Sequence, residues 1–333
     1  MRVTVPDYFE NFQCLAGECP HTCCEKWEVV IDEDSAALYE TVPGPLGEKL
    51  RSALQRDGDG DLCFPLNGGR CPFLDGDNLC EIHRKLGEAA TSVTCREHPR
   101  FTEDYGPFRE VTLSASCPAA NALLLGSEAP LTFRTYRTEE AGEEGDEWLA
   151  YLLPLRARML GILTDRSRPL KARLASFLSL ALSAQDCLDD GRPEAVAEAA
   201  EAPIPPAEKG LFPWGLRFLA SLEVLDADWP ILLAQAETAE KTPQAESLLE
   251  RVAVYFAVRY LLKTVNDGDL LSRAELCVFA VLTVERLAAV CGLPEALRRF
   301  SAEVEHDDIS LDALLTAFRE EAPLPWFLGE LED

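Results

Sequence analysis

The feature that most constrains this chain is the crowding of its cysteines. Nine of the twelve lie between Cys14 and Cys117, although the chain has 333 residues. A chain of that length can bury a sufficient core without cross-links, so the crowding needs a local cause. The N-terminal sequence lacks an apolar signal segment, and no stretch reaches the ~18 uninterrupted apolar residues of a membrane span. We therefore expect a cytoplasmic protein, in which clustered thiols are metal ligands rather than disulfides.

Eight of these thiols fall into short spacings that indicate metal binding. They are Cys14, Cys19, Cys23, Cys24, Cys71, Cys80, Cys95 and Cys117. Because adjacent cysteines do not easily enter one small coordination shell, Cys23 and Cys24 indicate either two metal centres or one ligand beside a supporting thiol. The sequence leaves that choice open.

The spacings do not by themselves choose the metal. Zinc sites usually bring two C-x2-4-C knuckles together, whereas iron–sulfur clusters accept thiolates from scattered loops. Only Cys19-x3-Cys23 resembles a knuckle. The other four cysteines fall outside the pattern and are interpreted as small buried hydrophobes or unrelated thiols: Cys63, Cys187, Cys277 and Cys291.

The charge of the chain limits the classes of partner. Its formal net charge is −27, and acidic residues predominate on both sides of residue 125. Nucleic acids and anionic membrane surfaces are bound through lysine and arginine, so neither is an expected partner. A protein substrate that presents lysine suits this charge better.

Beyond about residue 142 the sequence has a helical pattern. Trp148, Leu152, Leu155, Met159 and Leu163 recur at three- and four-residue intervals and define one apolar face. The chain is thus predicted to be mainly α, with an irregular cysteine-rich metal-binding module at 1–125 packed on an all-α helical domain at 126–333. A short strand is expected around Trp27 to Ile31 inside the module.

Local signals place the ends of two further helices. Thr242 followed by Pro243 predicts a helix start before the apolar stripe Leu249, Val252, Phe256 and Tyr260. Ser272 and Glu275 have the spacing of a capping box, and Gly292 with Pro294 predicts the stop of that helix. The acid- or proline-rich segments 139–147 and 202–208 are expected to be loops.

The cysteine blocks resemble those of the flagellin lysine N-methylases. The blocks that carry the resemblance are Pro6-Asp7-Tyr8, Phe12-Gln13-Cys14, Cys19-Pro20-His21-Thr22-Cys23-Cys24, Cys71-Pro72-Phe73-Leu74, Leu79-Cys80-Glu81-Ile82, Thr94-Cys95, Pro99-Arg100 and Ser116-Cys117-Pro118. The resemblance covers roughly residues 1–125. Thr91 and Asn121 depart from the family pattern without touching the thiols.

This resemblance implies an enzyme that transfers methyl groups from S-adenosylmethionine to lysine side chains of flagellin before export. The wider cysteine-cluster proteins that share this layout chelate zinc or iron, and we expect an iron–sulfur cluster of 4Fe–4S type, with zinc as the alternative. No strand–GxGxxG–helix unit is present, so the cofactor would not bind in a Rossmann manner. The radical-enzyme triplet C-x3-C-x2-C is missing too, because Lys26 stands where its third cysteine belongs.

Catalytic residues are not identified by the sequence. His21, His83 and His98 flank cluster cysteines and could act as a base or ligand, although loop histidines with no such role are commoner. Tyr8 and Asp32 could orient a lysine amine, or, like Arg100, merely brace the loops. Two other functions stay open: a metal-chelating or iron–sulfur redox or delivery protein with a helical partner-binding domain, and a structural adaptor stapled by metal.

Overall fold

The computed structural model describes residues 1–27, 29–58, 60–240, 242–306 and 308–332. Its α-helices are α1 (Glu33–Thr41), α2 (Gly44–Ala53), α3 (Glu81–Leu86), α4 (Val93–Glu97), α5 (Pro118–Leu125), α6 (Leu149–Thr164), α7 (Leu170–Asp189), α8 (Leu211–Leu219), α9 (Trp229–Thr238), α10 (Glu246–Tyr260), α11 (Leu271–Cys291), α12 (Leu293–Val304), α13 (Asp308–Glu320) and α14 (Leu324–Leu331). Its strands are β1 (Arg2–Pro6), β2 (Gln55–Arg56), β3 (Leu62–Cys63), β4 (Arg100–Asp104), β5 (Phe108–Leu113) and β6 (Phe133–Arg137).

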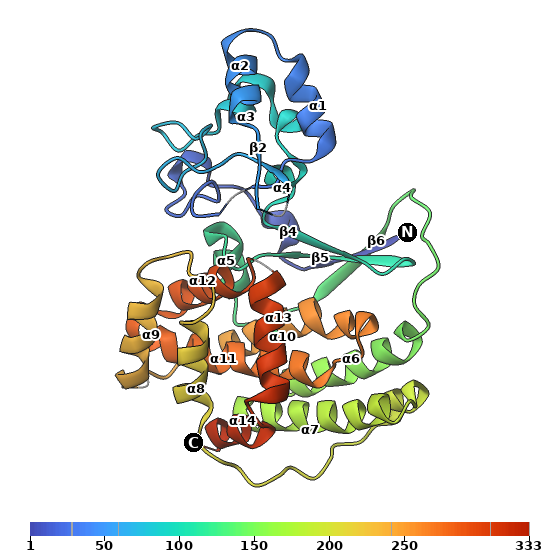
Figure 1. The fold of residues 1–333 in the computed structure, drawn as a ribbon. Helices are drawn as coiled ribbons and strands as arrows, with labels where there is room; N and C mark the ends of the chain where they lie inside the picture. Colours follow the sequence, from blue (N-terminus) through green and yellow to red (C-terminus); the bar gives the residue numbers. More distant parts are fainter. Residues whose placement is uncertain (28, 59, 241, 307, 333) are drawn as a thin grey trace.

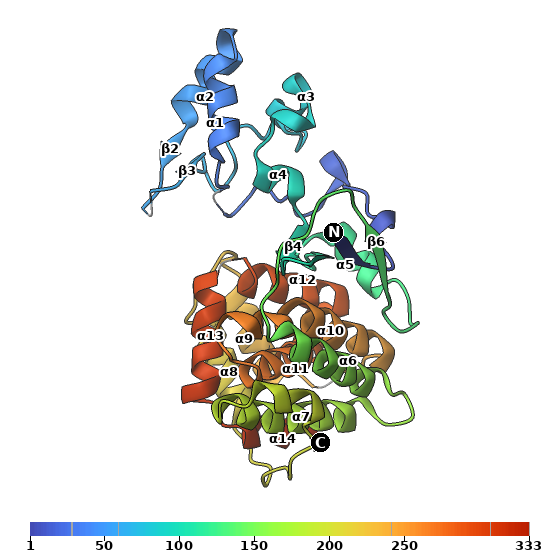
Figure 2. The same ribbon diagram turned by 90° about the vertical axis from the view of Figure 1, so that its right-hand side faces the viewer.

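The molecule is built in three tiers (Figure 1). A small cysteine-rich module with α1 to α4 lies at the top. A twisted sheet that contains β1, β4, β5 and β6 lies in the middle, and α6 to α14 form the helical body below it. The view turned by 90° shows the same stacking, with α5 and α12 lying where the sheet meets the body (Figure 2). Helices predominate, as the sequence predicted. No described helix is long and apolar enough to cross a membrane.

The sheet between the module and the helical body was not predicted from the sequence. Its strand order is β4-β5-β1-β6, with β1 parallel to β5 and antiparallel to β6. Alternate side chains face the helical body, where Glu110 pairs with Arg156 of α6 at 2.5 Å and Glu103 pairs with Lys263 at 2.6 Å. Since β6 follows residue 125 in sequence yet pairs with β1, the sheet draws on both predicted segments.

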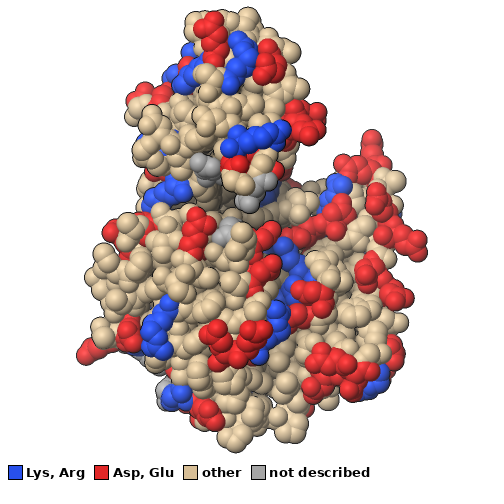
Figure 3. Space-filling view, viewed as in Figure 1, with Lys and Arg blue, Asp and Glu red and all other residues tan. Residues whose placement is uncertain are grey.

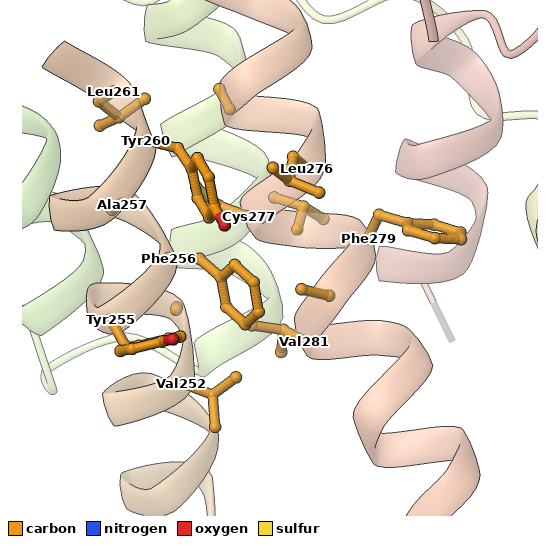
Figure 4. Close-up of a cluster of buried hydrophobic side chains, with 14 of the residues drawn as sticks. Val252, Tyr255, Phe256, Ala257, Tyr260, Leu261, Leu276, Cys277, Phe279 and Val281 are labelled. Atoms are coloured by element: carbon orange, nitrogen blue, oxygen red, sulfur yellow. The ribbon is translucent and has the colours of Figure 1, made fainter. Parts of the chain in front are cut away.

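The helical body has one large core centred on α10 and α11. Phe256 of α10 points toward α11, whereas Phe279 of α11 points to the opposite side (Figure 4) and meets Phe318 with ring centroids 5.4 Å apart; both are fully buried. Leu152, Leu155 and Met159 of α6 are buried in the same core, which confirms the predicted apolar face. The centre of the body is thus built from closely packed apolar side chains.

The predicted start of α10 was wrong. The helix begins at Glu246, and Thr242 and Pro243 lie in the extended segment before it. Ala245 occupies the N-cap position and provides no side-chain hydrogen bond. The predicted stripe is nevertheless confirmed, because Val252 and its companions are buried along the helix. Packing of that stripe, rather than the local capping signal, sets where this helix begins.

The predicted capping box at the start of α11 was also wrong. Ser272 already lies inside the helix, and its backbone N–H donates to the Asp269 carboxylate at 3.1 Å. Glu275 is buried in the interior instead of reaching back to the helix end. The stop was predicted correctly, since Gly292 ends α11 at φ 80°, a left-handed conformation that favours glycine. Pro294, which was predicted to be part of the same helix end, lies in the first turn of α12.

The cysteine-rich module has a second, smaller core of its own. Phe73 and Phe64 meet with ring centroids 4.6 Å apart, and Tyr39 stacks on Phe64 at 5.8 Å. This core is separate from that of the body. Around the strand expected at Trp27 to Ile31, only an isolated bridge between Val30 and Cys63 forms, and Glu28 lies outside the described residues.

Candidate functional site

Four of the predicted ligands lie near one another in the module, and two of them, Cys71 and Cys80, pack against its small core. The Cys71 backbone N–H donates to the Cys24 carbonyl at 2.8 Å. A bridge between Leu74 and Cys80 then folds the following turn back, and Leu74 itself donates to the Cys71 carbonyl at 3.0 Å. Cys95 completes this group, because each of the four thiols lies close enough to the other three to affect their charge.

Burial near other thiols disfavours the charged form of three members of this group, Cys71, Cys80 and Cys95. It raises the pKa of Cys71 to about 12, against a backbone hydrogen bond from Phe73. Cys95 reaches the surface, yet the protein packed around it raises the pKa of this thiol to about 11. Burial likewise raises the pKa of Cys80, while backbone groups of His83 and Ile82 act in the opposite direction. These thiols are therefore protonated at neutral pH and must release protons to bind a metal.

A second group of thiols faces the helical body. Cys14, Cys19 and Cys117 lie within one another's electrostatic influence. Ala16 donates its backbone N–H to the Cys14 sulfur at 3.4 Å, and the Cys19 thiol donates to the His21 carbonyl at 3.2 Å. Cys117 stands at the N-cap of α5, where burial raises its pKa and backbone groups of the first helical turn lower it.

Cys23 and Cys24 form the junction between the two groups. The Cys23 thiol donates a hydrogen bond to Cys24, which lowers the pKa of Cys24 and raises that of Cys23. Cys23 also lies within reach of the charges of Cys14 and Cys95, and Cys19 lies within reach of that of Cys24, so the two groups are close to each other. Trp27 fixes this turn, since its indole N–H donates to the Cys23 carbonyl at 2.9 Å and its ring meets His98 edge-on at 5.6 Å.

The helical body brings charged side chains to the second group. Arg298 of α12 lies near enough to Cys19 and His21 to affect the pKa of both. Glu295, one turn earlier, binds Arg298 at 2.7 Å and lies 3.8 Å from the His21 ring. Lys26 of the module pairs with Asp226 at 2.6 Å. Sequence reasoning missed these residues because nothing in their spacing shows that α12 meets the cysteine module.

The chemistry of the donors fits a metal, but their present arrangement is not a finished coordination shell. Half-buried thiols with backbone N–H groups directed at sulfur are suitable ligands for zinc or iron–sulfur clusters. Among the described residues, however, no three or more His, Cys, Asp or Glu side chains stand so that they could hold an ion. Ligation by the eight cysteines stays a prediction, and it would require their side chains to turn toward a shared point.

The four cysteines excluded from the site lie elsewhere. Cys277 is fully buried in the main core and donates to the Arg273 carbonyl at 3.1 Å. Cys63 is buried in β3. Cys187 and Cys291 are half-buried against the main core.

The weaker candidates mostly have structural partners. Asp32 caps α1 by accepting the Ser35 backbone N–H at 2.9 Å, and it accepts that of Val93 at 2.8 Å. Tyr8 is buried in the main core, and burial raises its pKa above the ordinary range. Burial lowers the pKa of His98 to about 4, so this ring is neutral at physiological pH. Arg100 lies 5.3 Å from the Phe12 ring centroid.

Three curated proteins show what the chain is similar to. The lysine-N-methylases of Salmonella choleraesuis and Salmonella typhimurium are each 28% identical over 149 residues, or 41% of this chain and 37% of the relative. The flagellar biosynthetic protein FliU of Salmonella muenchen is 28% identical over 129 residues, or 37% of this chain and 76% of the relative.

The chain thus spans little more than a third of the length of the two lysine-N-methylases that it matches. No family model matches the chain, and no solved structure matches it. The relatives nevertheless carry the names expected from the cysteine blocks. This chain is therefore related in sequence, over about two fifths of its length, to the flagellin lysine N-methylases, as its motifs indicated.

Proposed function

We propose that this protein methylates lysine side chains of flagellin, with S-adenosylmethionine as the methyl donor. The observation that carries the proposal is the concentration of eight thiols in the N-terminal module, in a chain whose relatives are named lysine-N-methylase. The flagellar relative supports flagellin as the substrate.

The reaction forms one bond and breaks one. The lysine nitrogen attacks the methyl carbon, the carbon–sulfur bond of the sulfonium breaks, and S-adenosylhomocysteine leaves. The nitrogen must be neutral to attack, so one proton is lost from the ammonium form. Acidic side chains are spread over the face seen in Figure 3, which suits a lysine-bearing protein better than a nucleic acid.

The eight predicted cysteines would hold the metal. An iron–sulfur cluster bound there would supply a redox-active centre, whereas zinc would chiefly fix the fold. What the chain itself provides is positioning. Arg298 and Glu295 bring the charged surface of α12 to the Cys19 side of the module, and the Lys26–Asp226 pair joins the module to the body.

A labelled-methyl assay tests the proposal. The purified full chain is incubated anaerobically with methyl-labelled S-adenosylmethionine and flagellin, and methyl-lysine is located by peptide mass spectrometry. We expect transfer by the wild type, a severe loss in Cys71→Ser, and little change in Cys187→Ser, whose thiol lies outside the site. Absence of methyl-lysine from a metal-loaded, folded wild type would refute the activity.

The same sample distinguishes a methylase from the main alternative, a metal-binding protein without enzymatic activity. A non-enzymatic chelating or redox protein would bind metal through the same thiols, and the eight cysteines by themselves suit both. Such a protein would not retain S-adenosylmethionine in equilibrium dialysis. Binding of the cofactor by the wild type, with loss in a variant that still folds, therefore favours the methylase.

A further inference from the structure

The last strand of the sheet has a free hydrogen-bonding edge. The strand order β4-β5-β1-β6 puts β6 at one border, and Figure 2 shows it on the outside of the sheet. The Thr138 N–H donates to the Met1 carbonyl at 2.9 Å, which fixes the alternation of bonds between β6 and β1. The N–H and C=O groups of Phe133, Thr135 and Arg137 therefore point away from β1. No other strand among the described residues pairs with them.

This edge is accessible and has a groove beside it. Every residue from Arg134 to Arg137 is exposed. Arg134 and Tyr136 belong to one face of the sheet and Thr135 to the other, because side chains alternate along a strand. All three border the groove, so it reaches the edge itself. The groove has a volume of about 260 Å³ and is lined by Val5, Glu10, Arg134, Thr135 and Tyr136.

Two arginines at this border lack a carboxylate partner. Arg2 of β1 and Arg137 of β6 are directly opposite each other in the ladder, both exposed, where like charges repel. Neither guanidinium forms an ion pair or hydrogen bond with another described residue, and that of Arg2 lies 5.8 Å from the Phe108 ring centroid. The chain has 58 Asp and Glu against 31 Lys and Arg, so this border is basic within an acidic protein. A carboxylate opposite Arg137 would relieve the repulsion.

Charged residues on an edge strand usually prevent pairing with other chains. That reading holds for a second copy of this chain, because two paired β6 strands would bring Arg134 and Arg137 of both copies onto one edge. The same charges attract a strand that carries carboxylates. The edge is therefore closed to itself and open to an acidic partner.

We propose that an extended acidic segment of the protein substrate binds to the free edge of β6 and adds a strand to the sheet. One of its carboxylates lies opposite Arg137, on the face that holds Arg2, and an apolar side chain enters the groove beside Tyr136. In strand addition the backbone hydrogen bonds supply affinity and alternate side chains supply specificity. The identity of the substrate rests on the proposed function, whereas the strand addition can be measured without methyl transfer.

Peptide binding to the full chain tests the docking edge. The probe is a short labelled peptide in which glutamate and valine alternate, and its counterpart has lysine in place of glutamate. Binding is measured by fluorescence anisotropy, and amide hydrogen exchange of residues 133–137 reports strand pairing.

Two variants alter the edge in different ways. Arg137→Glu reverses the charge, and its matched control is Arg217→Glu, at an exposed arginine of α8. Thr135→Pro removes an outward N–H without breaking a bond to β1, and its control is Thr135→Val, which keeps that N–H. Arg137→Glu leaves the backbone intact, so it decides the test if Thr135→Pro lowers Tm.

We expect the glutamate peptide to bind the wild type and both controls, more weakly as salt is added, and the lysine peptide not to bind. Binding should slow the exchange of the Thr135 and Arg137 amides. Each edge variant should weaken binding by roughly tenfold, the effect of losing about 1.4 kcal/mol. In the methyl-lysine assay the same two variants should raise KM for flagellin and leave kcat nearly unchanged.

Equal binding of the two peptides would overturn the proposal, and so would exchange at residues 133–137 that the bound peptide does not slow. A wild type with the mass of two chains that becomes one chain in Thr135→Pro would assign the edge to a second copy instead. Methylation of flagellin with KM unchanged in both edge variants would show that the substrate does not dock here. A wild type that binds the glutamate peptide but transfers no methyl group would uphold the acidic docking edge while refuting the proposed function.

Discussion

The buried carboxylate of Glu305 accepts hydrogen bonds from three side chains below the sheet, and we predict that Glu305→Ala lowers the stability of the helical body. Glu305 lies at the end of α12 with its side chain 1% exposed, and it accepts from Arg259 at 2.8 Å. Tyr260 and Tyr255 donate their hydroxyls to it at 2.6 and 3.1 Å. Tyr255 in turn accepts the Ala115 backbone N–H at 3.3 Å, two residues before a predicted metal ligand.

The expected loss of unfolding free energy follows from the burial of the residues that Glu305 contacts. Removing one member of a buried ion pair costs roughly 3–5 kcal/mol, because the remaining charge is left unpaired away from water. Here that charge is Arg259, which is only 5% exposed. For a body of this size each 1 kcal/mol lowers Tm by ~2–4 °C, so Glu305→Ala should lower Tm by about 10 °C.

Urea unfolding followed by far-ultraviolet circular dichroism measures the change. The matched control is Glu320→Ala, the same substitution at an exposed position near the end of α13, which should stay within about 0.5 kcal/mol of the wild type. The double variant Arg259→Met with Glu305→Gln should recover part of the loss, since no charge is then buried alone. A Glu305→Ala midpoint equal to that of the control would refute this account of the network.

Three further predictions concern the module, its junction with the body, and the packing of α14. Phe73→Ala removes a fully buried ring 4.6 Å from Phe64 and should cost roughly 3–5 kcal/mol, with faster hydrogen exchange confined to the module. Burial would raise the pKa of Glu295, but hydrogen bonds from two arginines lower it to about 2. Ionised Glu295 therefore stabilises the fold above the pKa of an unfolded glutamate, near 4.3, and this stabilisation is lost as the pH falls toward 2. In Glu295→Gln, Tm should therefore change less with pH between about 5 and 3 than in the wild type. Gly329→Ala would place a Cβ 1.8 Å from a backbone carbonyl oxygen and should destabilise by at least ~1–3 kcal/mol, whereas Gly161→Ala, with open space around it, should stabilise α6 by roughly 0.5–1 kcal/mol in thermal unfolding.

The sequence predicted the helical body well where packing and periodicity agree. The stripe through Val252 and Phe256 lies in the core, as its 3.6-residue repeat indicated, although α10 is buried on every side from Leu249 to Tyr260. The predicted starts at Thr242 and Ser272 were wrong, since capping signals contribute about 1 kcal/mol each and core packing contributes more. The sheet was missed because β1 and β6 are separated by more than a hundred residues, and no local pattern specifies their pairing.

The candidate site shows a similar limit. Spacing identified the eight cysteines, but spacing along the chain does not determine which thiols become neighbours. Cys71 is joined to Cys24 by a backbone hydrogen bond across 47 positions of sequence, and Cys23 lies within reach of both Cys14 and Cys95. The charged residues of α12 carry no sequence signal at all. Their proximity to Cys19 follows only from the docking of the module on the body.

That docking explains why a metal would be useful at this junction. The contact between module and body includes the Lys26–Asp226 ion pair, whose lysine is 43% exposed, and the His21–Glu295 contact at 3.8 Å. Exposed ion pairs contribute little to stability, about 0–1 kcal/mol each. A metal bound by Cys117 and the N-terminal loop would add a far stronger link, with apparent binding energies of ~10–16 kcal/mol for structural zinc. Removal of metal should therefore release the module from the body before either core unfolds, and hydrogen exchange at α5 and α12 would rise first.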